Sequence, residues 1–219
     1  MAIVRTAPWP ELRRRLPRLV FGLIFCGTGI AFQIQGDLGL GPWEVLHQGL
    51  SDRTGVPIGT VSILVGFVVL LGWIPLREKP GIGTLLNILV IGATTDVWLT
   101  FLPQPDPLWL RIVFMAMGPI GFGLGSGFYI GAGLGPGPRD GLMTGIAARG
   151  HSVRVVRTGI EVVALSLGWL LGGTVGIGTV VFALTIGPIV HRTLPWLGLP
   201  PLGDDPDPED DPVTATGAE

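Results

Sequence analysis

The sequence predicts an all-α membrane protein of about six transmembrane helices and two short re-entrant or interfacial helices, built from two internal repeats. Hydrophobic residues make up 47% of the 219 residues and charged residues only 14%, whereas soluble domains carry about 25% charged residues. Several apolar runs reach the roughly 20 residues that cross a bilayer. One short motif also occurs in each half of the chain, which predicts a duplication.

The repeated motif combines glycine and proline with an acidic residue. It reads Gly-Leu-Gly-Pro-Trp-Glu at 39–44 and Gly-Leu-Gly-Pro-Gly-Pro-Arg-Asp at 133–140. Because proline lacks an amide donor and suits the first turn of a helix, each copy is interpreted as a turn that starts a short helix. A second motif, Gly-Ile-Gly-Thr, follows at 81–84 and 176–179. The turn residues are Gly39, Gly41, Pro42, Gly133, Gly135 and Pro136.

In the first half, an apolar span is expected at about 18–35, with a short helix after it at about 43–53. At 1.5 Å per residue this helix reaches only ~16 Å, about half a bilayer. Further spans are expected at about 58–76 and from just after 81–83 to about 102, the latter with Asn87 and Asp96 inside it.

In the second half, a span at about 108–131 carries glycines at four-residue spacing, which favours close helix packing. A short helix at about 139–149 follows, and then spans at about 155–172 and 176–194. The expected parts are a cytoplasmic arginine-rich N-terminus (1–17), repeat one (18–103), a proline-rich linker (104–110), repeat two (111–195) and an acidic, disordered tail (196–219).

The distribution of basic residues predicts the orientation. With both termini in the cytoplasm, most arginines and the one lysine fall on the inner side, as the positive-inside rule requires. If the short helices do not cross, each half has three spans and the repeats have inverted topology, a plan common in secondary transporters. If they do cross, each half has four spans and the repeats are parallel. We favour the inverted arrangement, in the bacterial plasma membrane.

Five polar residues are candidates for a solute or ion pathway. Glu44 and Asp140 hold equivalent positions, where each either complements its own helix dipole or marks one of two sites that face opposite leaflets. Arg157 and Glu161 lie four residues apart and share a helix face, so they form either a structural ion pair or a proton or solute site. Asn87 is expected to hydrogen-bond between helices.

Catalytic and metal-binding patterns are missing from the sequence, so we expect no enzyme, no metal and no cofactor. His47 is interpreted as an interfacial polar residue, and the three histidines lack metal-ligand spacing. The glycine-rich stretches do not end in Gly-Lys-Ser/Thr and so are not phosphate loops. Six tryptophans near span ends are typical of an interfacial belt: Trp9, Trp73, Trp98, Trp109, Trp169 and Trp196. Nucleic acid is not an expected partner.

Several stretches together resemble one family. Residues 39–51, Gly-Thr-Val-Ser at 59–62 and Pro-Gly-Ile-Gly-Thr at 80–84 are similar to the YczE/YyaS/YitT family of bacterial integral membrane proteins. The second half resembles it at 133–142 and 157–161. The resemblance covers about residues 18–195 and implies a multi-pass plasma-membrane protein. This family is largely uncharacterised, so the resemblance transfers no catalytic residue.

Two functions remain open from the sequence. The first is a transporter or channel-like protein for a small solute, with the two glycine-proline motifs as its broken-helix elements. The alternative is a non-transporting scaffold that assembles a partner complex through its glycine faces. The expected partners are the lipid bilayer and an unidentified solute, and the glycine faces also allow a homo-oligomer.

Overall fold

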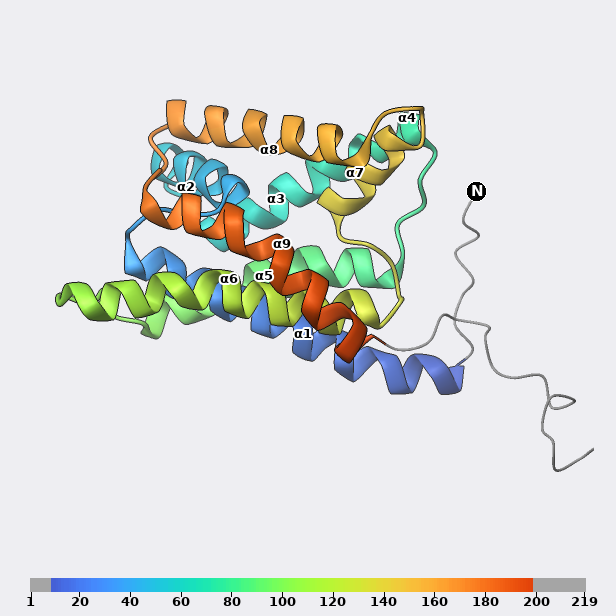
Figure 1. Cartoon of the computed structure of the whole chain (residues 1–219), viewed down its shortest axis with the longest axis horizontal. Coiled ribbons are helices and arrows are strands. Elements are labelled where there is room, and N and C mark those ends of the chain that lie inside the picture. The colour runs from blue at the N-terminus through green and yellow to red at the C-terminus, as the bar shows by residue number, and fades with distance from the viewer. Residues whose placement is uncertain (1–8, 199–219) are drawn as a thin grey trace, which may run out of the picture.

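The computed structural model describes residues 9–198, which fold as helices joined by turns and short loops (Figure 1). The expected tail lies outside the described residues except for 196–198, as do residues 1–8 of the expected N-terminal segment. In chain order the helices are α1 (Trp9–Gly36), α2 (Pro42–Thr54), α3 (Ile58–Leu71), α4 (Trp73–Leu76), α5 (Ile82–Phe101), α6 (Leu108–Gly131), α7 (Pro138–Ala147), α8 (Val153–Leu170) and α9 (Ile177–Leu197).

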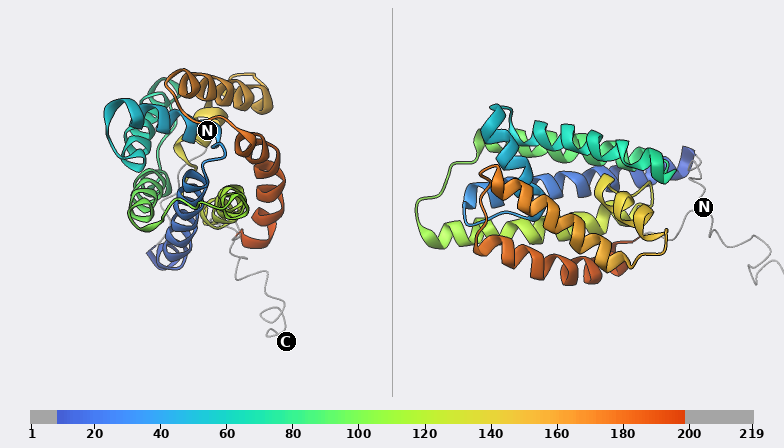
Figure 2. Two further views of the ribbon diagram at one scale, coloured as in Figure 1. Left: turned by 90° about the vertical axis from the view of Figure 1, so that its left-hand side faces the viewer. Right: turned by 90° about the horizontal axis from the view of Figure 1, so that it is seen from above.

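The long helices surround the two short ones. Helix α1 packs along α6, α5 packs on α1, and α9 packs on α6. Helices α3 and α8 complete the ring, and α2 and α7 lie within it toward opposite ends of the bundle (Figures 1 and 2). Helix α2 packs on α8 of the other half, and α7 packs on both α3 and α8. The two halves of the chain are therefore interleaved and share one interior.

Glycine allows the closest of these helix contacts. A methyl group on Gly22 of α1 would lie 2.7 Å from the carbonyl oxygen of Gly125 in α6, and one on Gly29 would lie 3.0 Å from the Cα of Gly121. In the same way, Gly127 of α6 faces Thr193 of α9. The predicted close packing by α6 is present, but α1 and α9 of the same chain occupy its glycine faces. Those faces are not available to a partner protein.

Five helices of the described chain are long and apolar enough to cross a membrane: α1, α3 with α4, α5, α6 and α9. The prediction was about six spans. Helix α8 is the expected span that does not qualify by composition, because Arg154, Arg157 and Glu161 place three charges on its 18 residues.

The element boundaries differ from the prediction in two places. Helix α1 begins at Trp9, so most of the arginine-rich segment is helical instead of preceding the first helix. The expected second span is interrupted at Gly72, where α3 ends and α4 begins. Trp73 at this break is only 2% exposed and donates a hydrogen bond of 3.0 Å to the carbonyl oxygen of Pro138. Its assignment to an interfacial belt was therefore wrong.

Each long helix runs antiparallel to the helix with which the predicted repeat pairs it. Helix α1 runs from the end of the bundle where residue 9 lies to the opposite end, and α6 runs back beside it (Figure 1). Likewise α3 and α8 run in opposite directions, as do α5 and α9.

Candidate functional site

The two short helices begin with the same local geometry. Their N-cap residues, Gly41 and Gly137, both have φ −61° and ψ 158°, and a proline holds the first helical position in each. A carboxylate, Glu44 in α2 and Asp140 in α7, lies in each first turn, where the positive end of the helix dipole stabilises it.

The loops before α2 and α7 each contact the other half of the chain. The carbonyl oxygen of Leu38 accepts a hydrogen bond of 2.7 Å from the amide of Gly178, and that of Leu134 accepts one of 2.9 Å from the amide of Gly83. These contacts bring each glycine-proline motif against the Gly-Ile-Gly-Thr motif of the other half. Thr84 strengthens the second contact by donating a hydrogen bond of 2.7 Å to the carbonyl oxygen of Pro136.

The motif glycines serve this close approach. Gly39, Gly133 and Gly135 have positive φ angles of 109°, 66° and 126°, which side chains disfavour. A methyl group on Gly39 would also lie 2.6 Å from the amide nitrogen of Gly176. The predicted turns are therefore present. Glycine is required at position 39 both by the positive φ angle and by the close contact with Gly176.

The first turns of α2 and α7 meet inside the bundle. Arg139 donates a hydrogen bond of 2.9 Å from Nη2 to Oε1 of Glu44, which joins the two helices. The hypothesis of two sites facing opposite leaflets is therefore wrong, because the helices start near the middle and extend toward opposite ends. Their N-termini face one shared space.

That space is a cavity of about 580 Å³, within the range of sites for small organic ligands. All five candidate residues, Glu44, Asn87, Asp140, Arg157 and Glu161, line it. They come from α2, α5, α7 and α8, so both halves contribute. Their role in a solute pathway stays a prediction, but their assembly around one cavity is a property of the fold.

Glu44 belongs to a charged cluster on one side of this cavity. Its side chain is 3% exposed and pairs with Arg139, whose guanidinium lies 4.9 Å from the ring centre of Trp43. His47, one turn further along α2, is only 4% exposed. The interfacial position expected for His47 was wrong, since α2 lies inside the ring of helices.

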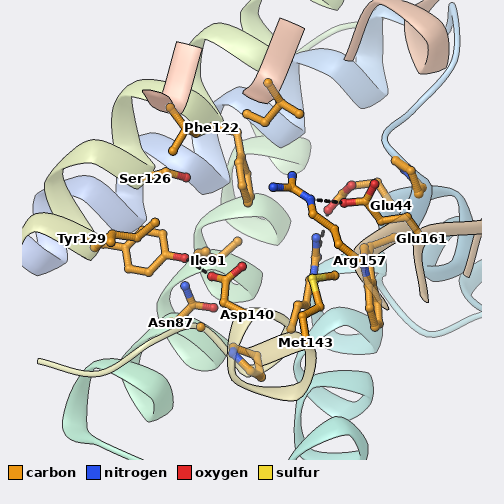
Figure 3. A pocket seen from close by; sticks show the side chains of 18 of the residues that line it. Glu44, Asn87, Ile91, Phe122, Ser126, Tyr129, Asp140, Met143, Arg157 and Glu161 are labelled. Atoms are coloured by element: carbon orange, nitrogen blue, oxygen red, sulfur yellow. Dashed lines mark hydrogen bonds and ion pairs between the residues drawn. The ribbon is translucent and has the colours of Figure 1, made fainter. Parts of the chain in front are cut away.

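Asp140 belongs to a second polar cluster. Tyr129 of α6 donates a hydrogen bond of 2.7 Å to Asp140 Oδ2. Asn87 of α5 lies beside them, and the apolar side chains of Ile91 and Phe122 adjoin this cluster (Figure 3). Asn87 thus contributes to the cavity wall. Within the described residues its side chain makes no hydrogen bond to another helix, so the interhelical hydrogen bond expected for it was wrong.

Arg157 and Glu161 lie on α8, where the cavity approaches the surface. The predicted ion pair is present, with 2.9 Å between Arg157 Nε and Glu161 Oε1, and the two side chains are 49% and 32% exposed. Among the described helices, α8 and α9 make no extensive contact here. A methyl group on Gly187 of α9, which lines the cavity, would touch nothing within 4 Å.

Sequence reasoning missed Arg139 and Tyr129 as site residues. Arg139 immediately precedes Asp140 in the repeated motif, but its partner Glu44 is 95 residues away. Tyr129 is the one tyrosine of the chain, and that signal could have drawn attention to it. Within residues 9–198 no group of three or more His, Cys, Asp or Glu side chains is placed to hold a metal ion.

The fold and its apolar helices define a multi-pass α-helical membrane protein. The chain belongs to a family of unknown function, DUF6198, which matches residues 13–194. It is 41% identical over 187 residues to an uncharacterised protein of Haemophilus influenzae, covering 85% of this chain and 86% of that one.

Two proteins of Bacillus subtilis are also similar. The uncharacterised membrane protein YczE is 37% identical over 178 residues, covering 80% of this chain and 82% of YczE. YyaS is 27% identical over 181 residues, covering 80% of this chain and 89% of YyaS. The resemblance found from the motifs is thereby confirmed. No solved structure is significantly similar to the chain.

Proposed function

We propose that this protein is a bacterial plasma-membrane transporter that carries a small solute through the shared cavity by alternating access. The observation that carries this proposal is one cavity of about 580 Å³ built by both halves of the chain, with the N-termini of two short helices facing it. Short or broken helices whose ends face a mid-membrane site are typical of transporters made of inverted repeats.

The antiparallel course of matching helices supports inverted repeats, with α2 and α7 as short helices that do not cross. Helix α8 would then be a sixth crossing, with its charged residues turned toward the cavity and one end of the bundle. The end at which α1 begins and α9 ends holds most of the basic residues, so it would be cytoplasmic. The segments at this end are the first turns of α1 and α8, α4 with the loop after it, the end of α7 with the loop after it, and the last turns of α9 (Figure 1). Their basic residues are Arg13, Arg14, Arg15, Arg18, Arg77, Lys79, Arg149, Arg154 and Arg192.

The two halves of the chain differ in how tightly their helices pack against one another, and this difference supports a transport cycle. In the first half, a methyl group on Gly92 of α5 would lie 2.5 Å from the carbonyl oxygen of Gly59 in α3. Asp96 fixes this contact by accepting hydrogen bonds of 2.6 and 2.7 Å from the amides of Gly59 and Thr60. In the second half, Gly187 aligns with Gly92 but faces open space. The cavity would thus be open between α8 and α9 and closed between α3 and α5.

Cysteine labelling tests alternating access without knowledge of the solute. The chain has one cysteine, Cys26, which is free and 0% exposed. A second cysteine at Ser62, which lines the cavity, should react with a membrane-impermeant maleimide from both faces of oriented vesicles. Labelling from neither face, or from one face under every condition, would contradict a transport cycle.

A matched pair of glycine variants shows whether labelling passes through the cavity. Gly187→Trp should block labelling of Ser62→Cys, because the indole would fill space beside the cavity. Gly159→Trp is the control, since a side chain at Gly159 on α8 also meets nothing within 4 Å and Gly159 does not line the cavity. Equal loss of labelling in both variants would show that the effect is not specific to the cavity.

The scaffold alternative keeps less support. It relied on glycine faces that contact α1 and α9 of the same chain. A scaffold also has no need for a cavity lined by charged residues from three helices.

A further inference from the structure

One wall of the cavity holds three polar groups around a glycine that has no side chain to fill the space between them. A methyl group on Gly137 would lie 3.1 Å from Asp140 Oδ2, 3.2 Å from Tyr129 Oη and 3.4 Å from Asn87 Nδ2. These groups come from α7, α6 and α5, and all three residues line the cavity. We call Gly137 and these three residues the Gly137 cradle.

The charge balance of the cavity singles out Asp140. Glu44 is paired with Arg139 and Glu161 with Arg157, each at 2.9 Å. Among the residues that the structure describes, the Asp140 carboxylate has a neutral hydroxyl, that of Tyr129, as its hydrogen-bond partner and no ion-pair partner. The Asp, Glu and Arg side chains that line the cavity therefore include three carboxylates and two guanidinium groups.

The dipole of α7 does not reverse this balance. The N-terminus of a helix carries about half a positive charge, whereas an ionised carboxylate carries a full negative charge. The cradle therefore attracts a cation more than an anion. Because most of the cavity lining around the carboxylate is apolar, a cation that pairs with the carboxylate is favoured there.

The surroundings of the cradle favour a cation with an apolar body over a bare metal ion. Ile91, Phe122 and Met143, labelled in Figure 3, line the same cavity as Asp140. Phe122 also makes an edge-on contact with Phe182, with ring centres 6.0 Å apart, and both rings line the cavity. A cavity of about 580 Å³ exceeds what an ammonium group alone would occupy.

The matching position in the other half is different. A methyl group on Gly41 would lie 2.5 Å from Glu44 Oε2 and 3.1 Å from the ring of Phe182. Phe182 thus takes the place that Asn87 has in the cradle, three residues after the threonine of the Gly-Ile-Gly-Thr motif. One end of the cavity can receive a polar head group, and the other presents an aromatic ring.

We propose that the cavity binds an organic ammonium ion, with its charged nitrogen in the Gly137 cradle and its apolar body against Phe122 and Phe182. The ammonium would donate hydrogen bonds to the Asp140 carboxylate and to the carbonyl oxygen of Asn87, whose amide presents this atom when turned over. Tyr129 positions the carboxylate through its hydroxyl group. The inference rests on the proposed transport function and names the class of its substrate.

Three ligands with the same aromatic body test the head group. Phenethylammonium, phenethyl alcohol and phenylacetate carry a positive, neutral and negative head group, and each is offered to the purified full-length protein in detergent by equilibrium dialysis. Phenethylammonium should bind and the other two should bind at least about tenfold more weakly, the fold-change that 1.4 kcal/mol produces. Preference for the carboxylate, equal binding of all three, or binding of none overturns the proposal.

Two variants test the site. Asp140→Asn keeps an oxygen for the Tyr129 hydroxyl but removes the charge, and it should weaken phenethylammonium binding about ten- to a hundredfold. Gly137→Ala should weaken it also, because the methyl group fills the cradle at a φ of −61° that alanine readily adopts. Asp106→Asn, at an exposed loop residue, is the control for the change in charge. Binding that survives both cradle variants overturns the proposal.

Failure of this inference can be told apart from failure of the transport proposal. Specific ammonium binding together with one-sided labelling of Ser62→Cys would retain the binding site and reject transport. Two-sided labelling without ammonium binding would retain transport and reject the ammonium ion as the substrate class.

Discussion

Arg139 donates a hydrogen bond of 2.9 Å to Glu44 across 95 residues of sequence, joining the first turns of α2 and α7. The Glu44 side chain is 3% exposed and the Arg139 side chain 24% exposed. This pair fixes where the two short helices meet and so shapes one side of the cavity.

Removal of either partner of this pair should destabilise the protein. Glu44→Gln leaves a guanidinium without its counter-charge, and Arg139→Gln leaves a buried carboxylate, a change that costs ~3–5 kcal/mol in buried pairs. The double variant should lose less than the sum of the single losses, because it leaves no uncompensated charge. Chemical denaturation of the detergent-solubilised protein measures all three. Strictly additive losses would show that the pair is not coupled.

Asp96 should hold the contact between α3 and α5 closed. Its carboxylate accepts three hydrogen bonds of 2.6 to 2.8 Å at the start of α3, including one from Thr60 Oγ1. Hydrogen bonds to a charged group contribute ~1.5–3 kcal/mol each, so Asp96→Asn should favour opening at this end. Labelling of Ser62→Cys from the outer face should become faster, whereas Asp106→Asn should leave the rate unchanged. An unchanged rate in Asp96→Asn would exclude this role.

Gly168 and Gly159 lie on the same helix but should respond in opposite ways to alanine. A methyl group on Gly168 would lie 2.5 Å from the carbonyl carbon of Val45, so α2 would have to move away from α8. A methyl group on Gly159 meets nothing within 4 Å. We expect Gly168→Ala to lower the unfolding temperature and Gly159→Ala to keep or raise it, since alanine favours a helix over glycine by ~1 kcal/mol. Similar effects at both positions would contradict the close contact.

Trp73 and Trp169 each follow a glycine and occupy equivalent positions in the predicted repeats, which provides another comparison. Trp73 is 2% exposed and bonds to Pro138 at the start of α7, whereas Trp169 is 66% exposed. Trp73→Phe should cost ~1–3 kcal/mol, because a buried carbonyl oxygen loses its donor. Trp169→Phe should change the free energy of unfolding little. Denaturation curves of the two variants decide the matter, and equal losses would refute the special role of Trp73.

The sequence predicted the elements well where composition and local chemistry determine them. The lengths of the apolar runs predicted the bounds of α5 and α6 closely, and the glycine-proline motif predicted where α2 and α7 begin. It failed where burial depends on distant segments. His47 and Trp73 resemble interfacial residues by position along the chain, yet both are buried. Helix α2, which carries His47, packs on α8, and Trp73 packs on α7, so the covering helices come much later in the chain.

The residues of the candidate site were likewise predicted where the signal is local and missed where it depends on distant partners. Local arguments found Glu44, Asp140, Arg157, Glu161 and Asn87, because polar residues are rare in apolar helices and attract notice. They did not find Arg139 and Tyr129, whose significance comes from their partners. Of the two interpretations left open for Glu44 and Asp140, neither placed them at one site, because helix starts in separate halves of a sequence carry no information about their distance.

The sequence by itself determined that this chain is a multi-pass helical membrane protein of the YczE and YyaS kind, with two short helices that begin at glycine-proline turns. Hydrophobic length and backbone chemistry are local properties, so they can be read along the chain. The tertiary structure alone decided that both short helices face one cavity and that α3 closes on α5 while α8 does not close on α9. Those features depend on how helices from the two halves pack around one another, where small glycine surfaces and single ion pairs determine which contacts form.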